Sequence, residues 1–322
     1  MRYLNTESIK KIGIDWQQTI DTIRQTVFTL HHNEVAQPIK PYLRYRDPVN
    51  RIIAMPAFVG GDINMAGIKW IASFPKNIQH GIQRAHSVTI LNESSTGKPL
   101  AVLSTALVSG IRTASVTGLI IQKYAERFPL HAVTVGIIGF GPIGQLHLQM
   151  VSELLGERIS QVLLYDIAGI KTEQIPEAIR ERVTVVPSWE EAYQKADIFI
   201  TCTVSAGGYI DKKPKDRSLL LNVSLRDFKP EILDYTSSII VDDWEEVCRE
   251  NTDIELMHMH RGLQKSDTQS ITGIICEDKM KMFPANMPII FNPMGMAIFD
   301  VAISTYFYRK ALQKGVGVEL DE

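Results

Sequence analysis

Hydrophobic and polar residues follow two different patterns along this chain, and the pattern changes near residue 129. Residues 8–32 and 104–126 carry apolar side chains at helical spacing, whereas residues 38–72 and 87–93 read as extended segments. Later in the chain, short apolar runs alternate with helical segments. These runs lie at 132–138, 161–166, 182–186, 197–203, 218–224 and 238–242. Such alternation is typical of a parallel sheet that is covered on both faces.

The last periodic segment, residues 294–315, predicts one amphipathic helix that ends at a glycine. Because this helix follows the alternating part without belonging to its repeat, we expect it to return to the N-terminal part of the chain. The predicted fold is therefore α/β, with a Rossmann-type parallel sheet domain inserted in a discontinuous α+β domain. The inserted domain spans residues 119–295, and the α+β domain consists of residues 1–118 and 296–322.

A glycine-rich turn directly follows the first run of the alternating part. The sequence there is AVTVGIIGFGPIG, residues 132–144. In a dinucleotide site, Gly139 would allow the tight turn, Gly141 would let the backbone approach a pyrophosphate, and Gly144 would let the helix pack closely on the strand. The N–H groups at the helix start would face the phosphates. The alternative is a glycine-rich turn in another kind of α/β unit.

The next apolar run, QVLLYD, ends in Asp166, about 20 residues after the last glycine. An acid at this distance is typical of one that accepts hydrogen bonds from the adenosine ribose. A carboxylate also repels a 2′-phosphate, and Ile167 and Ala168 offer no cation to receive one. The sequence therefore favours NAD over NADP, although Lys171 lies nearby.

Composition narrows the class of protein. The 322 residues exceed the usual size of one domain, and 45% hydrophobic with 22% charged residues is ordinary for a soluble globular protein. A net charge of −2 without blocks of lysine or arginine predicts no nucleic-acid partner. We also expect no membrane segment, no signal peptide and a cytoplasmic location. The three widely spaced cysteines predict reduced thiols and no metal site.

Cations accumulate in N-terminal segments that otherwise read as buried or half-buried. Lys69 lies in MAGIKWIASF, where a lysine either extends its ammonium to solvent or finds an anionic partner. A buried lysine with a lowered pKa is also a candidate proton donor or acceptor. Arg112 in SGIRTAS is either a surface residue or an anion ligand beside the small residues around Thr113.

Two further candidates follow buried runs of the predicted parallel sheet. Asp227 comes just after LLLNVSL, and Thr203 ends DIFITCT. Ligands of open α/β sheets bind at the carboxyl ends of strands, so Asp227 is a candidate catalytic acid or base and Thr203 a candidate cofactor contact. The alternatives are an aspartate that caps the next turn and a threonine that satisfies the strand end.

A family resemblance covers nearly the whole chain. The segments MPAFVGG, AGIKWIASFPKN, ILNESSTGKPLAVL, IRTAS, GFGPIG, NVSLRDFKPEIL and FNPMGMAIFD occur in the order of the ornithine cyclodeaminase and mu-crystallin family, which this chain resembles. The resemblance implies two domains, one for substrate binding and dimerisation, a homodimer, and a nicotinamide that exchanges hydride with a carbon bearing nitrogen.

The resemblance also implies site residues. Catalysis would fall to Lys69 and Asp227, and substrate binding to Lys40, Lys69, Arg84 and Arg112. Cofactor contacts would come from Arg112, Thr113, Gly139, Gly141, Pro142, Ile143, Asp166, Thr203, Asn222, Val223 and Ser224.

Departures from the common family pattern suggest one branch of it. Lys40 stands where many members have arginine, Arg84 stands where several have threonine, and the late segment reads FNPMG. These features resemble the branch that supplies L-2,3-diaminopropionate for siderophores and peptide antibiotics by oxidising N-(2-amino-2-carboxyethyl)-L-glutamate with NAD. That substrate has three carboxylates, which suits Lys40, Lys69 and Arg84, but Arg84 is alternatively a solvated loop residue.

Other functions stay open on sequence alone. Ornithine cyclodeamination would borrow and return the hydride and release ammonia. A ketimine reductase or an alanine dehydrogenase would use the same residues on a smaller substrate. A nucleotide-binding protein without turnover is a third class, although such a protein has no need to keep Lys69, Arg112 and Asp227 together.

Overall fold

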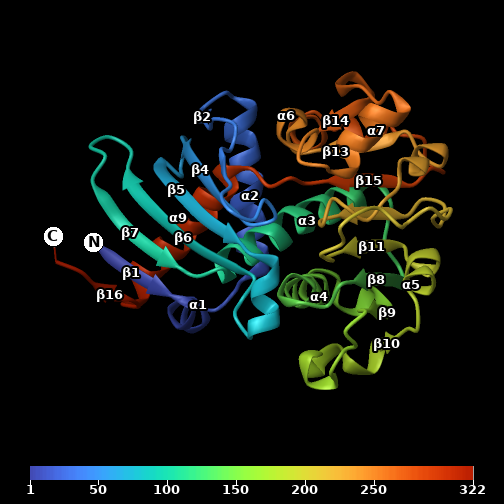
Figure 1. Cartoon of the computed structure of the whole chain (residues 1–322), viewed down its shortest axis with the longest axis horizontal. Helices are drawn as coiled ribbons and strands as arrows, with labels where there is room; N and C mark the ends of the chain where they lie inside the picture. Colours follow the sequence, from blue (N-terminus) through green and yellow to red (C-terminus); the bar gives the residue numbers. More distant parts are fainter. Residues whose placement is uncertain (322) are drawn as a thin grey trace. The chain divides into compact units, whose positions relative to one another are not determined.

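The computed structural model describes residues 1–321, which divide into two compact units (Figure 1). One unit combines Met1–Arg112 with the chain from Gly295 on, and the other is Thr113–Met294. The sequence-based division lies close by, at 118/119 and 295/296. The first unit carries a largely antiparallel sheet and the second a parallel one, so the predicted α/β class is confirmed.

Unit 1, the discontinuous unit, is built on an eight-stranded sheet with the order β16-β1-β7-β6-β5-β4-β2, in which β3 also pairs with β4. Helix α3 (Leu107–Arg127) begins in unit 1 and continues into unit 2. The remaining elements of unit 1 are β1 (Arg2–Asn5), α1 (Thr6–Ile12), α2 (Trp16–His31), β2 (Val35–Ala36), β3 (Tyr42–Leu43), β4 (Arg51–Val59), β5 (Met65–Ser73), η1 (Pro75–His80), β6 (Ala85–Glu93), β7 (Pro99–Ser104), α9 (Ala297–Lys314) and β16 (Val318–Glu319).

The C-terminal helix α9 packs against α2 and strands β4, β5 and β6, which confirms the expected return of this segment to the N-terminal part. Its apolar side chains Phe299, Ile303 and Phe307 are fully buried. The helical spacing of residues 8–32 corresponds to two helices, α1 and α2. Gly13, with a φ of +83°, ends α1, and the Asp15 side chain then caps a new helix, α2.

Unit 2 contains an all-parallel sheet with the order β10-β9-β8-β11-β12-β15-β13-β14. Its strands are β8 (Val133–Ile138), β9 (Ile159–Tyr165), β10 (Val183–Val185), β11 (Ile198–Thr201), β12 (Leu219–Asn222), β13 (Ser238–Val241), β14 (Thr268–Ser270) and β15 (Ile289–Asn292). Its α-helices are α4 (Pro142–Leu155), α5 (Trp189–Lys195), α6 (Trp244–Val247), α7 (Asp253–Arg261) and α8 (Ile271–Cys276). Short 3-10 helices are η2 (Gly156–Arg158), η3 (Thr172–Gln174), η4 (Glu177–Arg182), η5 (Pro230–Asp234), η6 (Lys265–Asp267) and η7 (Lys279–Met282).

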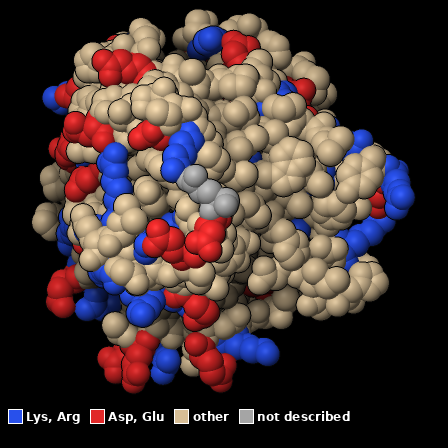
Figure 2. Space-filling model, turned by 90° about the vertical axis from the view of Figure 1, so that its left-hand side faces the viewer, with Lys and Arg blue, Asp and Glu red and all other residues tan. Residues whose placement is uncertain are grey.

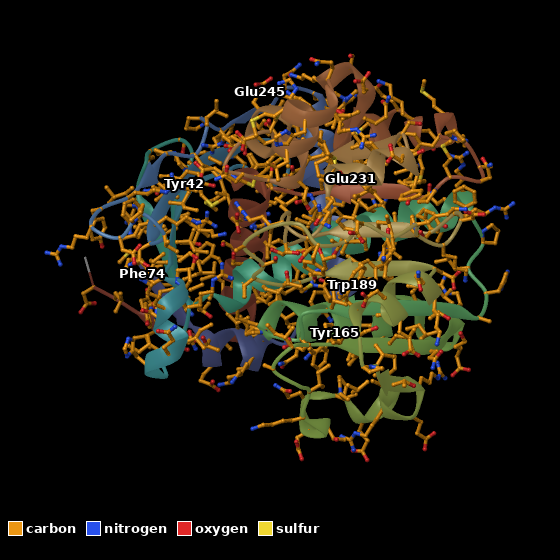
Figure 3. The ribbon with its side chains drawn as sticks, turned by 45° about the vertical axis from the view of Figure 1, so that its right-hand side comes forward. Tyr42, Phe74, Tyr165, Trp189, Glu231 and Glu245 are labelled. Atoms are coloured by element: carbon orange, nitrogen blue, oxygen red, sulfur yellow. The ribbon has the colours of Figure 1, made fainter. Side chains whose placement is uncertain are left out.

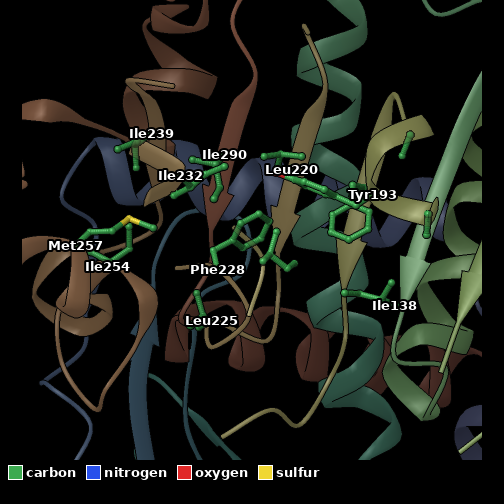
Figure 4. Close-up of a cluster of buried hydrophobic side chains, with 14 of the residues drawn as sticks. Ile138, Tyr193, Leu220, Leu225, Phe228, Ile232, Ile239, Ile254, Met257 and Ile290 are labelled. Carbon is green, nitrogen blue, oxygen red and sulfur yellow. The ribbon is translucent and has the colours of Figure 1, made fainter. Parts of the chain in front are cut away.

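The strand order of unit 2 reverses between β8 and β11, the point at which ligands of such sheets bind. A buried apolar cluster supports the strands there: Tyr193, Leu220, Phe228 and Ile290 lie together in it (Figure 4). Strands β14 and β15 were missed by the sequence analysis: β14 is polar, whereas β15 (IIFN) is as apolar as the strands that were predicted. This core therefore fixes the strand ends on which the candidate residues lie.

Charged side chains of both signs are intermingled on the left of the face shown in Figure 2, and an area with few of them lies right of centre. Among residues 1–321, no helix combines the length and the apolar character that crossing a membrane requires.

Candidate functional site

The three glycines of the turn after β8 differ in what surrounds them. A Cβ on Gly139, where φ is +80°, would lie 2.6 Å from the backbone of Cys202, and one on Gly144 would lie 2.2 Å from the carbonyl oxygen of Gly139. Both positions therefore exclude a side chain for reasons of the fold. A Cβ on Gly141 would meet nothing within 4 Å. The fold therefore does not require a glycine at position 141, and the absence of a side chain leaves open space at the start of α4.

Helix α4 begins in that open space with the geometry of an anion site. Gly141 is its N-cap and supplies no side-chain hydrogen bond, and Pro142 occupies the first turn. The N–H groups that begin a helix carry partial positive charge and bind phosphates when they lack a side-chain cap. The turn thus fits a pyrophosphate.

Asp166 lies directly beside the glycine turn. It follows Tyr165, the last residue of β9 (Figure 3), and its carboxylate accepts hydrogen bonds from the N–H groups of Phe140 at 2.6 Å and Ala168 at 2.8 Å. The carboxylate is half-buried. An acid in this position suits a ribose, so the residues of unit 2 fit a dinucleotide.

Asp227 lies at the carboxyl end of the same sheet and is fully buried. Thr203 and Ser224 donate hydrogen bonds to its two carboxylate oxygens, and the Tyr209 hydroxyl hydrogen-bonds to it as well. Burial raises the pKa of Asp227, and the hydrogen bonds from Thr203 and Tyr209 oppose that rise. The Asp227 carboxylate binds side-chain hydroxyls and does not act as a helix cap. Asp227 is thus a buried carboxyl group surrounded by hydroxyls, a candidate for proton exchange.

The expected cofactor stretch Asn222–Ser224 begins with Asn222, the last residue of β12. Asn222 and Ser224 take part in buried hydrogen bonds around Asp227, and Val223 lies between them, half-buried. Tyr209 and Asp253 are functional candidates that the sequence analysis missed. Tyr209 packs its ring on Trp189 of α5 at 5.4 Å, which holds its hydroxyl near Asp227.

Unit 1 contains a buried cluster of charges around one carboxylate. Asp300 of α9 accepts hydrogen bonds on the same oxygen, Oδ1, from Lys69 Nζ and Arg112 Nε, both at 3.0 Å. Lys69 Nζ also donates to the Ser109 hydroxyl at 2.6 Å. Lys69 and Arg112 are 2% and 7% exposed, so neither extends to solvent. Thr113 follows Arg112 on α3.

The segment Gln37–Lys40 is anchored to the start of α9. Gln37 Oε1 accepts a hydrogen bond from the N–H of Ile298 at 3.2 Å, and the buried Lys40 Nζ donates to the Gly295 carbonyl at 2.9 Å. Gly295 has a φ of +86°, and a Cβ there would lie 2.5 Å from the Arg112 guanidinium. Arg112 therefore packs against bare backbone. Arg84, at the start of β6, is half-buried.

The charges of this cluster perturb one another. Burial, together with the neighbouring charges of Arg112 and Lys40, lowers the pKa of Lys69 to about 8, and Asp300 opposes this fall. Burial alone would raise the pKa of Asp300, but Arg112 and Lys69 outweigh this and hold its pKa below the usual value. Since two cations share one carboxylate oxygen and a third lies close by, the cluster favours binding of a further anion.

The chain is similar to known proteins over nearly its whole length. The model of the ornithine cyclodeaminase/mu-crystallin family matches residues 6–315. The N-((2S)-2-amino-2-carboxyethyl)-L-glutamate dehydrogenase of Staphylococcus aureus is 31% identical, over 100% of this chain and 98% of that relative.

Two solved structures share the fold. The Delta(1)-pyrroline-2-carboxylate reductase of Thermococcus litoralis, solved with NADH and L-proline, superposes with a TM-score of 0.87 at 22% identity, over 99% of this chain and 100% of the other. An archaeal alanine dehydrogenase dimer with bound NAD gives 0.81 at 23% identity, over 100% and 99% of the two chains.

Proposed function

The chain belongs to the ornithine cyclodeaminase/mu-crystallin family, and we propose that it is an NAD-dependent dehydrogenase acting on N-(2-amino-2-carboxyethyl)-L-glutamate. Oxidation of the secondary amine gives an imine, and hydrolysis of the imine gives 2-oxoglutarate and L-2,3-diaminopropionate. The relative from Staphylococcus aureus, whose name states this substrate, supports the proposal over the full length of the chain.

The observation that carries the proposal is the buried cluster of Lys40, Lys69 and Arg112 around Asp300. Burying several cations beside one carboxylate is costly unless an anionic ligand completes the charge balance. A substrate with three carboxylates supplies that balance better than ornithine, which carries a second cation, or alanine, which carries one carboxylate.

Each residue has a defined task in the proposed reaction. Lys69, Arg112 and Lys40 bind and orient the substrate carboxylates, so that the hydrogen on the glutamate Cα can leave as hydride. NAD, held by the glycine turn and Asp166, supplies the hydride acceptor. The amine also loses its proton, and Lys69 or Asp227 accepts it.

Imine hydrolysis needs a second proton transfer. Asp227, buried among three hydroxyls, removes a proton from the attacking water. The balanced reaction consumes substrate, NAD⁺ and water, and it yields 2-oxoglutarate, L-2,3-diaminopropionate, NADH and a proton. D227N should abolish turnover while leaving NADH binding intact.

The test is a substrate panel with the purified protein and NAD. We expect NADH formation and stoichiometric 2-oxoglutarate only with N-(2-amino-2-carboxyethyl)-L-glutamate. Proline and ammonia from ornithine without net NADH would show ornithine cyclodeaminase instead. NADH formation from alanine or proline alone would show an alanine dehydrogenase or a ketimine reductase running in reverse.

We also propose that the protein is a homodimer that associates through the outer face of the unit 1 sheet. The side chains of this face are mostly apolar. Ile68 and Ile90 are register partners on β5 and β6, and Trp70 lies two residues along β5 on the same face. Trp70 and Ile90 are 44% and 36% exposed. An apolar sheet face of this kind supports an interface between protein chains.

A further inference from the structure

Asp253, the first residue of α7, is a fully buried carboxylate to which the proposed function gives no task. Its Oδ2 atom accepts three hydrogen bonds, from the N–H groups of Asp227 at 3.1 Å and Phe228 at 3.0 Å and from Asn222 Nδ2 at 2.9 Å. Two of these three donors belong to the turn that carries Asp227. A residue from a distant part of the sequence therefore holds the backbone of Asp227 itself.

The turn held by Asp253 has a backbone that needs support. Leu225 has a φ of +61°, a left-handed conformation that is unfavourable for a leucine. The Asp253 N–H donates to the Leu225 carbonyl at 2.8 Å, while the side chain of Asp253 binds the N–H groups two and three residues further on. Asp253 thus binds both the strained residue and the backbone that follows it.

Asn222 extends this support to the hydroxyls around Asp227. Besides donating to Asp253, it accepts hydrogen bonds from Thr201 Oγ1 and from the Leu225 N–H, both at 3.2 Å. The Ser224 hydroxyl lies 2.7 Å from Thr201 Oγ1 and also hydrogen-bonds to Asp227. A closed network therefore joins the carboxylate of Asp227 to that of Asp253.

Capping of its own helix does not account for this carboxylate. The N-cap of α7 is Thr252, whose hydroxyl accepts a hydrogen bond from the Glu255 N–H. The second oxygen of Asp253, Oδ1, is buried and has no hydrogen-bond partner among the described residues. A buried carboxylate oxygen without a partner is unfavourable, so the side chain is retained for its contacts with the Asp227 turn.

We propose that Asp253 is a positioning residue for Asp227: it fixes the turn so that the Asp227 carboxylate faces the reacting groups, and it does not itself exchange protons with substrate. The inference rests on the proposed function, in which Asp227 transfers protons. Asp253 acts by accepting hydrogen bonds, and an amide oxygen can accept the same three. The proposed role therefore requires a side chain of this shape with an accepting oxygen, and it does not require the negative charge.

The test compares D253A, D253N and the control D197A. Asp197 also accepts a backbone hydrogen bond, from the Thr134 N–H at 2.9 Å, but it lies just before β11, at the amino end of that strand, whereas Asp227 follows the carboxyl end of β12. For D253A we expect kcat to fall about 100-fold with an unchanged Kd for NADH, since small misplacements of a catalytic group have effects of this size. D253N should recover most of kcat, and D197A should keep it.

Amide hydrogen exchange of residues 223–229 gives a readout that needs no turnover. Exchange there should rise in D253A, return toward wild type in D253N, and stay unchanged in D197A and D227N. If D253A does not fold, D253S replaces it, because serine is too short to reach all three donors.

Wild-type exchange of this segment in D253A or D253S would overturn the inference. A kcat in D253N as low as in D253A, or an equal loss in D197A, would overturn it too. If the wild-type protein forms no NADH from the proposed substrate, the proposed function fails, and hydrogen exchange still decides the role of Asp253.

Discussion

Lys69 is the residue whose chemistry depends most on its surroundings. Burial lowers its pKa to about 8, so its neutral fraction grows as the pH rises through 8. A lysine that accepts the proton of the substrate amine works only when neutral, whereas one that only binds a carboxylate works only when charged. We expect kcat/KM to rise with pH through about 8.

The variant D300N isolates the part of this pH profile that belongs to Lys69. Asp300 raises the pKa of Lys69, so its loss should move the rise to lower pH, while the ionisation of the free substrate stays where it is. K69R should lose the rise together with most of the activity. A kcat/KM that falls as the pH increases through 8 would assign Lys69 to carboxylate binding alone.

At the residue scale, the sequence indicated the cations but missed their shared anion. Lys69 stands out because apolar residues flank it, and Arg112 because small residues follow it. Asp300 is a single acid on a helix, where an exposed position is the ordinary expectation. Its partners Arg112 and Lys69 are 188 and 231 residues away in the sequence, and no local pattern encodes such contacts. Asp253 was missed for the same reason.

At the element scale, Gly141 and Gly144 at the junction of β8 and α4 are expected to respond differently to substitution by alanine. In G141A the new methyl group enters open space and the φ of −70° suits alanine, so the fold should stay intact. If the glycine turn binds the cofactor as proposed, the same methyl group would take the space of the phosphates. We expect the Kd for NADH to rise about 10- to 100-fold, the equivalent of one charge-assisted hydrogen bond lost, without a change in melting temperature.

Gly144 supplies the matched comparison. A Cβ there would lie 2.2 Å from a carbonyl oxygen of the backbone, which has little freedom to move. G144A should lower the unfolding free energy by about 1–3 kcal/mol, as overpacking does elsewhere. Thermal unfolding and NADH fluorescence titration of both variants distinguish the two effects. Equal loss of stability in G141A and G144A would contradict the assignment of Gly141 to the cofactor.

Most helices and strands could be predicted because each has its own hydrophobic periodicity. The alternation of apolar runs with helices predicted six strands of the parallel sheet, and the structure has all six. Where a strand is polar, as in β14, pairing with a neighbouring strand and not the local sequence places it in the sheet. The break between α1 and α2 depends on the left-handed backbone of Gly13, which periodicity alone does not show.

At the scale of the whole molecule, the discontinuous unit was predicted from two observations: the change of pattern near residue 129, and the helical segment 294–315 that does not belong to the repeat before it. Helix α9 is apolar on the face that meets β4, β5 and β6, and this part of the chain therefore could not belong to the inserted unit. The outer face of the same sheet is also mostly apolar. Helix α9 packs on the inner face, whereas Trp70 and Ile90 on the outer face are exposed in the part of the chain that the structure describes.

A two-sided apolar sheet predicts association, and Trp70 gives the means to test it. We expect the wild-type protein to sediment as a dimer and W70E as a monomer, because the glutamate would be buried without a partner at the interface. The control is M282E, which places the same charge on a residue of unit 2 that is 70% exposed. It should leave the dimer intact. A monomeric wild type, or a W70E variant that remains dimeric, would show that this face is not the interface.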